Sequence, residues 1–86
     1  MSYVVYILEC SDGSLYAGAT NDLKKRLVEH NAGKRGAKYT RARRPVVLRY
    51  SKSFRTLARA RAYEAEIKRM KREEKIVLIK IASKNR

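Results

Sequence analysis

Five residues have side chains suited to reactions at phosphorus: Tyr6, Tyr16, Arg26, His30 and Glu64. Hydrolysis of a phosphodiester requires an activated water, neutralisation of the phosphate charge and stabilisation of the leaving oxygen. His30 is the only histidine, and the ordinary pKa of an imidazole suits a general base. A tyrosine becomes a base only if a neighbouring cation lowers its pKa from about 10. The residue types therefore leave both kinds of base open.

Glu64 is the one acid that periodicity places on the inward face of a predicted helix. That face repeats at intervals of three or four residues and comprises Leu57, Ala60, Glu64 and Ile67. Glu66 belongs to an exposed, ion-paired face that it shares with Arg59, Arg69 and Glu73. A carboxylate among apolar groups is costly unless it is paired or binds a metal. A buried salt bridge to Arg26 and a ligand position for one divalent ion both remain open.

Positive charge dominates the composition. The 86 residues include 22 Lys and Arg against 8 Asp and Glu, so the formal net charge is +14. Such a field attracts polyanions, and nucleic acid is the expected partner because phosphate contacts supply most sequence-independent affinity. The apolar content of 44% excludes a disordered chain, and we find no apolar run long enough for a membrane span. The single cysteine, Cys10, fits a packing position in a cytoplasmic protein.

The segment 33–44 concentrates this charge. We predict a loop that holds six basic residues, no acid and one aromatic ring: Lys34, Arg35, Lys38, Tyr39, Arg41, Arg43 and Arg44. Cations that contact phosphates, around a ring that can stack on a base, are typical of sites for single-stranded or distorted nucleic acid. For Tyr39, packing on the core is the alternative interpretation.

Hydrophobic patterns predict the elements that position these side chains. Residues 3–9 are apolar at almost every position, which indicates a central strand covered on both faces. A three-residue turn with Gly13 at positive φ connects it to a strand at 15–19. In this register Tyr6 pairs with Gly18, and the two tyrosines project from one face. A two-residue loop would instead point the tyrosines to opposite faces.

The next predicted element is a helix that begins after a cap at Asn21 or Asp22 and ends at Gly33. Its buried side is assigned to Leu23, Leu27 and Val28. Arg26 and His30 lie four positions apart beside this apolar side, so both side chains can reach the edge of the sheet.

The second half of the chain is predicted to form a strand and two helices. The strand covers 46–52 after Pro45 and lies antiparallel to the first strand. One helix extends from a cap at Thr56 to about Met70, and the other covers 72–82, although its residues 76–79 could form a strand by periodicity alone. The fold class is therefore α+β, a three-stranded antiparallel sheet flanked by helices in the order ββαβαα, with one domain at 1–84 and a short basic tail at 85–86.

An ordered set of short motifs resembles the GIY-YIG nuclease superfamily, and most closely its small stand-alone branch. The motifs extend over essentially the whole chain: Val4-Val5-Tyr6, Asp12-Gly13, Tyr16-Ala17-Gly18, Asn21-Asp22-Leu23, Arg26, Glu29-His30-Asn31, Lys38-Tyr39-Thr40, Arg44-Pro45, Glu64 and Ile67-Lys68. The resemblance implies that Tyr6 or Tyr16 is the general base. It also implies that Arg26 clamps the phosphate and that Glu64 is the sole protein ligand of one Mg²⁺, which Mn²⁺ could replace. His30 would assist by hydrogen bonding to a tyrosine or to the phosphate.

Two positions depart from the superfamily's pattern. Val4 replaces the glycine of the first motif, on a strand where the change affects packing. Ala19 stands where some members place a lysine, so a second cation at the phosphate is missing unless Lys38 or Lys68 replaces it. The second departure bears on the rate of the expected reaction rather than on its type.

The resemblance thus implies a Mg²⁺-dependent endonuclease that leaves 5′-phosphate and 3′-hydroxyl ends. DNA is favoured over RNA as the partner, and Lys68 joins the predicted nucleic-acid contacts. We expect a monomer whose specificity could come from an unidentified protein partner. A nucleic-acid-binding module without catalysis and a basic ribosome-associated protein are the alternatives. The inward Glu64 and the paired tyrosines favour the enzyme, because binding alone requires neither.

Overall fold

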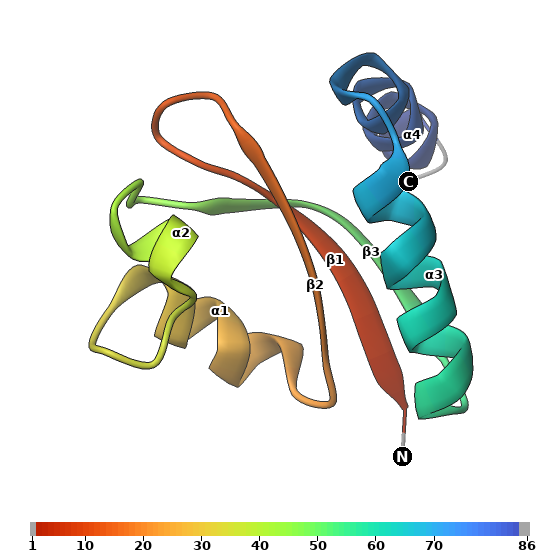
Figure 1. Cartoon of the computed structure of the whole chain (residues 1–86), viewed down its shortest axis with the longest axis horizontal. Helices are drawn as coiled ribbons and strands as arrows, with labels where there is room; N and C mark the ends of the chain where they lie inside the picture. The colour runs from red at the N-terminus through yellow and green to blue at the C-terminus, as the bar shows by residue number, and fades with distance from the viewer. Residues whose placement is uncertain (1, 85–86) are drawn as a thin grey trace.

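The computed structural model describes residues 2–84. Within them it contains a three-stranded antiparallel sheet and four helices (Figure 1). The elements in chain order are β1 (Tyr3–Glu9), β2 (Leu15–Thr20), α1 (Leu23–Asn31), α2 (Lys38–Arg41), β3 (Val47–Phe54), α3 (Leu57–Arg69) and α4 (Arg72–Lys84). The strand order is β2-β1-β3, which confirms the predicted fold class and the central place of the first strand. The predicted tail at 85–86 lies outside the described residues.

The hairpin of β1 and β2 has the predicted register. Tyr6 pairs with Gly18, so Tyr6 and Tyr16 project from the same face of the sheet. Gly13 has a φ of 84°, a conformation that glycine adopts without the steric cost of a Cβ. Its amide donates to the carbonyl of Cys10 at 2.9 Å and closes the turn.

A hydrophobic cluster packs on each face of the sheet. The cluster under α3 contains Val5, Ile7, Ala17, Tyr50, Ala60 and Ile67. The cluster on the α1 side contains Tyr6, Leu8, Cys10 and Val46, with Leu23 and Leu27 packed against it. Figure 1 shows α1 and α2 on one side of the sheet and α3 and α4 on the other. Strand β1 supplies buried side chains to both clusters, which explains its continuous apolar sequence.

Capping residues set the ends of α1 and α3 as predicted. The side chain of Asp22 accepts from the backbone amide of Lys25 at 3.1 Å, and Gly33, with a φ of 74°, follows the last turn of α1. Thr56 caps α3 by accepting from the amide of Arg59 at 3.2 Å.

Residues 76–79 are helical and lie within α4. The carboxylate of Glu74 accepts from the backbone amide of Lys71 at 2.8 Å, which satisfies a free donor at the start of the helix. Leu78 and Ile79 then pack against the cluster under α3. No helix within residues 2–84 is long and apolar enough to cross a membrane.

The buried side of α1 differs from the prediction at one position. Val28 is 62% exposed, whereas His30 is fully buried. The face of α1 that meets the sheet passes through Leu23, Leu27 and His30, and each residue advances about 100° around a helix. Val28 therefore turns toward solvent, and its assignment to the buried side was wrong.

The prediction of a loop throughout 33–44 was wrong in part, because one turn of helix, α2, forms within it. Arg44 ties the end of this segment to the end of α1. Its Nε donates to the carbonyl of His30 and its Nη2 to the carbonyl of Gly33, each at 2.8 Å. These contacts satisfy carbonyls that the helix leaves without partners. Arg44 thereby fixes the position of the 33–44 segment relative to α1.

Gly18 permits the close approach of Tyr6 to β2. A methyl group at position 18 would lie 2.5 Å from the hydroxyl oxygen of Tyr6 and 2.7 Å from its Cζ. We expect Gly18→Ala to lower the free energy of unfolding by about 1–3 kcal/mol, because overpacking displaces the buried ring. Urea denaturation measures this change. The cost should shrink in a Tyr6→Leu background, which lacks the clashing atoms, and an equal cost in both backgrounds would contradict the assignment.

Candidate active site

Tyr6 and His30 form a buried hydrogen-bonded pair. The hydroxyl oxygen of Tyr6 lies 2.8 Å from Nε2 of His30. The two side chains are 2% and 0% exposed, respectively. Strand β1 supplies the tyrosine and the last turn of α1 supplies the histidine, so the pair exists only because α1 packs on the sheet. The structure thus brings together two of the predicted catalytic residues.

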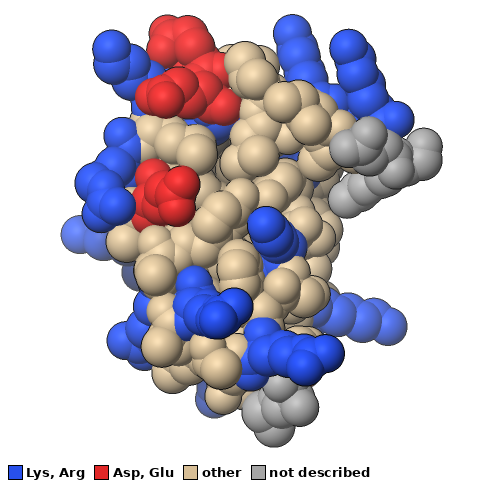
Figure 2. Space-filling model, turned by 90° about the vertical axis from the view of Figure 1, so that its right-hand side faces the viewer, with Lys and Arg blue, Asp and Glu red and all other residues tan. Residues whose placement is uncertain are grey.

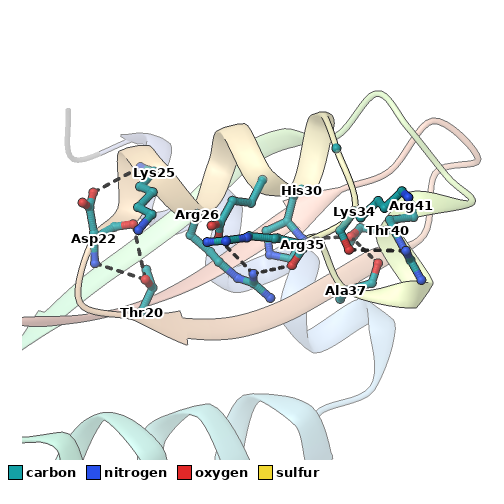
Figure 3. Close-up of polar contacts among 12 residues, drawn as sticks. Thr20, Asp22, Lys25, Arg26, His30, Lys34, Arg35, Ala37, Thr40 and Arg41 are labelled. Carbon is teal, nitrogen blue, oxygen red and sulfur yellow. Dashed lines mark hydrogen bonds and ion pairs between the residues drawn. The ribbon is translucent and has the colours of Figure 1, made fainter.

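The other ring nitrogen of His30 contacts Thr40 of α2. Nδ1 lies 2.8 Å from Oγ1 of Thr40, and that oxygen lies 3.0 Å from the carbonyl oxygen of Ala37 (Figure 3). Thr40 is fully buried. Thr40 was not among the predicted site residues, because a predicted loop has no periodicity that marks an inward side chain. Its place in the Lys38-Tyr39-Thr40 motif was the one available signal.

Burial shifts the pKa of each partner in the direction that disfavours its charged form. The lowered pKa that a tyrosine base was expected to have is not found for Tyr6: loss of solvation raises its pKa to about 12, and the guanidinium of Arg26 opposes the rise without outweighing it. Loss of solvation also lowers the pKa of His30 to about 4, and the positive charges of Arg26 and Arg44 act in the same direction. At neutral pH the pair therefore consists of a phenol and a neutral imidazole.

Arg26 is oriented beside this pair. Its Nη1 donates to Oε1 of Glu29 at 3.1 Å and to the backbone carbonyl of Arg35 at 2.8 Å, as Figure 3 shows. The side chain of Arg26 remains 28% exposed. A guanidinium that is held in place but still reaches solvent is suited to bind a phosphate oxygen.

Tyr16 lies beside His30 and stacks on Tyr39. The centroid of its ring is 5.4 Å from that of His30, in an edge-to-face arrangement, and 5.9 Å from that of Tyr39. The guanidinium of Arg43 lies 3.8 Å from the centre of the Tyr39 ring, and its Nε donates to the carboxylate of Asp12 at 3.0 Å. Tyr39 is 38% exposed and is not a core residue. A nucleobase that stacked on Tyr39 would compete with the ring of Tyr16 and the guanidinium of Arg43, which both contact the Tyr39 ring.

The helical phase assigned to α3 is correct in its centre. Ala60 and Ile67 are fully buried, and the side chain of Glu64 is 21% exposed. Leu57 is 43% exposed because it opens the helix beyond the edge of the cluster. Glu66 is exposed as predicted, but within residues 2–84 no ion pair joins it, so the description of its face as ion-paired was wrong in that respect.

Glu64 and Tyr6 lie on opposite faces of the sheet, and Glu64 is next to the edge strand β2. It lines a cavity of about 450 Å³ with Tyr3, Ala19, Thr20, Asn21, Leu57 and Arg61. Its Oε2 pairs with Nζ of Lys68 at 3.0 Å. The alternative of a buried bridge from Glu64 to Arg26 is not what the structure shows, because Arg26 pairs with Glu29. The negative charge of Glu64 nevertheless contributes to the raised pKa of Tyr6, so the two faces are electrostatically coupled.

The donors near Glu64 fit a hydrated Mg²⁺ rather than a closed metal site. Within residues 2–84 no three His, Cys, Asp or Glu side chains gather as a ligand cluster. Mg²⁺ keeps several waters and is commonly held by one or two carboxylates, so a single Glu64 carboxylate on an open cavity suffices. Lys68 shares that carboxylate and would have to move or be displaced.

The predicted nucleic-acid contacts divide into exposed and engaged cations. Lys34, Arg35, Lys38 and Arg41 are exposed, although Arg41 also donates to the backbone carbonyl of Lys34 at 3.3 Å. Arg43, Arg44 and Lys68 contact Asp12, backbone carbonyls and Glu64, respectively. On the α3 and α4 side, Figure 2 shows Lys and Arg spread over the surface, whereas Asp and Glu gather toward one part of it. The exposed set is therefore the better candidate for phosphate contact.

Comparisons with known proteins agree with this architecture. A model of the family described as the GIY-YIG catalytic domain matches residues 2–76. A UPF0213 protein of Syntrophus aciditrophicus is 55% identical over 76 residues, which cover 88% of this chain and 87% of that protein. The solution NMR structure of a UPF0213 protein from Bacillus halodurans has a TM-score of 0.61 at 42% identity and covers 94% of this chain and 85% of that one. A second NMR structure, of a protein from E. faecalis, has a TM-score of 0.66 at 39% identity over 96% and 88% of the two chains.

The low pKa of His30 predicts a specific dependence of stability on pH. Because its folded pKa of about 4 lies below the unfolded value of 6.5, the unfolded chain binds more protons between these pH values. The stabilisation is complete above pH 6.5 and is lost as the pH falls toward 4. Between pH 7.5 and 5 we expect the free energy of unfolding to fall by about 2 kcal/mol more in the wild type than in His30→Gln.

Urea denaturation at the two pH values measures this difference. Both proteins share the same carboxylates, and the wild type has only one histidine. Subtracting the loss of stability in His30→Gln from the loss in the wild type therefore isolates the contribution of His30. Equal losses in the two proteins would mean that His30 is charged or solvated in the folded state.

Proposed function

Because the chain belongs to the GIY-YIG catalytic domain family, we propose that it is a metal-dependent endonuclease that hydrolyses phosphodiester bonds in DNA. The observation that supports this most strongly is the buried hydrogen bond between Tyr6 and His30, with Arg26 and Tyr16 beside it. Binding of nucleic acid by itself does not require an acid–base pair of this kind beside a guanidinium. Aligned acid–base groups next to an oriented guanidinium are what proton transfer at a phosphate requires.

The proposed roles follow from exposure and contacts. Tyr6 deprotonates the attacking water, and His30 assists through the hydrogen bond to the phenol. Arg26 binds a non-bridging phosphate oxygen and offsets the charge that develops in the transition state. Tyr16 is less buried than Tyr6 and orients the phosphate or the water by hydrogen bonding. The new bond joins the water oxygen to phosphorus, the bond to the 3′ oxygen breaks, and that oxygen takes a proton from solvent, so the products carry 5′-phosphate and 3′-hydroxyl ends.

Glu64 is the residue that would hold the metal. Mg²⁺, or Mn²⁺ in its place, would supply neutralisation of phosphate charge and stabilisation of the leaving oxygen there. Lys68 pairs with the Glu64 carboxylate in the structure and would leave that carboxylate when the metal binds. The displaced Lys68 ammonium would then be available to a phosphate oxygen, and Lys38, which is exposed, is the other candidate for the cation that is missing at Ala19.

The substrate reaches the site along the exposed cations of 34–41. Their contacts to phosphates would be independent of sequence, and DNA remains favoured over RNA. The protein acts as a monomer in the cytoplasm, and a protein partner or the shape of the substrate supplies the specificity. A binding module without catalysis is the second candidate. It is favoured by the pKa of about 12 for Tyr6 and by the occupancy of Glu64 by Lys68.

Replacing each tyrosine by phenylalanine tests the proposed base. We expect Tyr6→Phe to lower cleavage by about 100-fold or more and to leave DNA affinity nearly unchanged, because only the phenol oxygen is lost. Tyr16→Phe should have the smaller effect. Single-turnover cleavage of single-stranded, duplex, flap and branched DNA, with and without Mg²⁺ or Mn²⁺, measures both. Wild-type protein that binds every substrate and cleaves none would support the binding module instead.

Two neighbouring acids of α3 provide a matched test of the metal site. Glu64→Ala should abolish cleavage and Mn²⁺ binding, because it removes the one carboxylate on the cavity. Glu66→Ala should retain both, since the exposed carboxylate has no role in the site. Titration of Mn²⁺ into the two variants, with urea denaturation of the same samples, separates loss of metal from loss of fold. Metal binding that survives in Glu64→Ala but is lost in Glu66→Ala would refute the assignment.

A further inference from the structure

Thr40 occupies a position that the proposed roles do not use. Its side chain is fully buried, and its hydroxyl oxygen lies between Nδ1 of His30 at 2.8 Å and the carbonyl oxygen of Ala37 at 3.0 Å (Figure 3). The contacts form a chain of hydrogen bonds from the phenol of Tyr6 through the imidazole and the hydroxyl to a backbone carbonyl.

The direction of each hydrogen bond in this chain can be deduced from its ends. A backbone carbonyl only accepts, so the single hydrogen of the Thr40 hydroxyl is directed to Ala37. The hydroxyl oxygen must then accept from His30, which places a hydrogen on Nδ1. A neutral imidazole with a hydrogen on Nδ1 has a bare Nε2, which accepts from the phenol of Tyr6.

The other end of the chain requires the same direction. Within residues 2–84 the hydroxyl of Tyr6 has one hydrogen-bond acceptor, Nε2 of His30. Tyr6 is only 2% exposed. The charge of Arg26, a donor without acceptor capacity, lies beside the phenol oxygen. If Nε2 carried the hydrogen, the buried phenol hydrogen would have no partner, which is costly. Both ends therefore select the tautomer with the hydrogen on Nδ1.

We propose that Thr40 is a positioning residue that holds His30 in this tautomer, so that Nε2 receives the proton of Tyr6 when Tyr6 deprotonates the attacking water. One proton leaves the water for the phenol oxygen while the phenol proton moves to Nε2, and the imidazolium keeps donating from Nδ1 to Thr40. After the products leave, the protons return along the same path to solvent. The tautomer is a property of the folded chain, whereas its catalytic consequence rests on the proposed function.

This relay removes an obstacle to the use of Tyr6 as a base. A free tyrosinate is inaccessible at neutral pH for a phenol whose pKa is about 12. A relay to His30 never requires one, because the phenol oxygen gains a proton as it loses another, but it places a positive charge on an imidazole whose pKa is about 4, so the negative charge of the bound phosphate must stabilise that imidazolium. The ionisable groups that face His30 are Tyr6 of β1, Tyr16 of β2, Arg26 and Glu29 of α1, and Arg44.

Two variants separate the hydroxyl of Thr40 from its bulk. Thr40→Ser keeps the hydroxyl, and Thr40→Val keeps the shape without it. The tautomer is read from the ¹⁵N chemical shifts of the imidazole at pH 7, and the signals are unambiguous because the chain has one histidine. We expect the hydrogen on Nδ1 in the wild type and Thr40→Ser. In Thr40→Val the share of the tautomer with the hydrogen on Nε2 should rise, because a buried Nδ1–H would lack an acceptor while the phenol of Tyr6 still favours the hydrogen on Nδ1.

Cleavage assays on the same samples test the catalytic consequence. Thr40→Val should lose about 10-fold or more in single-turnover rate, and Thr40→Ser should stay near the wild type. Wild-type protein with the hydrogen on Nε2 would overturn the proposal, and that measurement does not depend on whether a variant folds. Equal cleavage by Thr40→Val after a tautomer change would overturn the relay. Absence of cleavage in the wild type would refute the proposed function but leave the tautomer assignment intact.

Discussion

The buried hydrogen bond between Tyr6 and His30 is the interaction on which the rest of the site depends. It places two ionisable groups where water cannot solvate their charged forms, so each keeps its neutral state until another group stabilises the charge. The bond needs a strand in the centre of the sheet, a helix packed across it and a following turn that supplies Thr40. The segment 33–44 is therefore part of the site rather than a peripheral basic loop.

Edge strand β2 divides the chemistry into two parts. The phenol, the imidazole and the guanidinium of Arg26 lie on the α1 face, and the carboxylate of Glu64 lies on the α3 face. Gly18 allows Tyr6 to reach across the strand, because any Cβ there would collide with the phenol. Within residues 2–84 no further strand pairs with the outer side of β2.

The large excess of positive charge serves more than one purpose. Arg43 and Arg44 hold the hairpin turn and the end of α1 in place, and Lys68 pairs with Glu64. Arg26 is oriented by Glu29 and by a backbone carbonyl. Among the exposed cations of the 33–44 segment, Arg41 donates to the backbone carbonyl of Lys34 at 3.3 Å. A basic composition therefore indicates a polyanionic partner without indicating which cations would touch it.

The sequence by itself determined most of the fold, because the relevant signals are local. The apolar run at 3–9, the turn at Gly13 and the caps at Asp22 and Thr56 each act within a few residues, and the ends of α1 and α3 followed from them. The family motifs also selected the side chains of the site. The pairing of Tyr6 with Gly18 followed from the turn.

Only the tertiary structure decided which side chains meet and what each cation does. Val28 faces solvent and His30 is buried because the sheet covers one side of α1. The spacing of apolar residues along the helix does not by itself locate that side to within one residue. Glu64 pairs with Lys68 rather than Arg26, since these groups lie on opposite faces of the sheet. Thr40 is buried because the 33–44 segment turns back onto α1, where its hydroxyl contacts His30. Contacts between residues distant in the chain leave no periodic signal in the sequence, so their geometry emerges only when the elements pack.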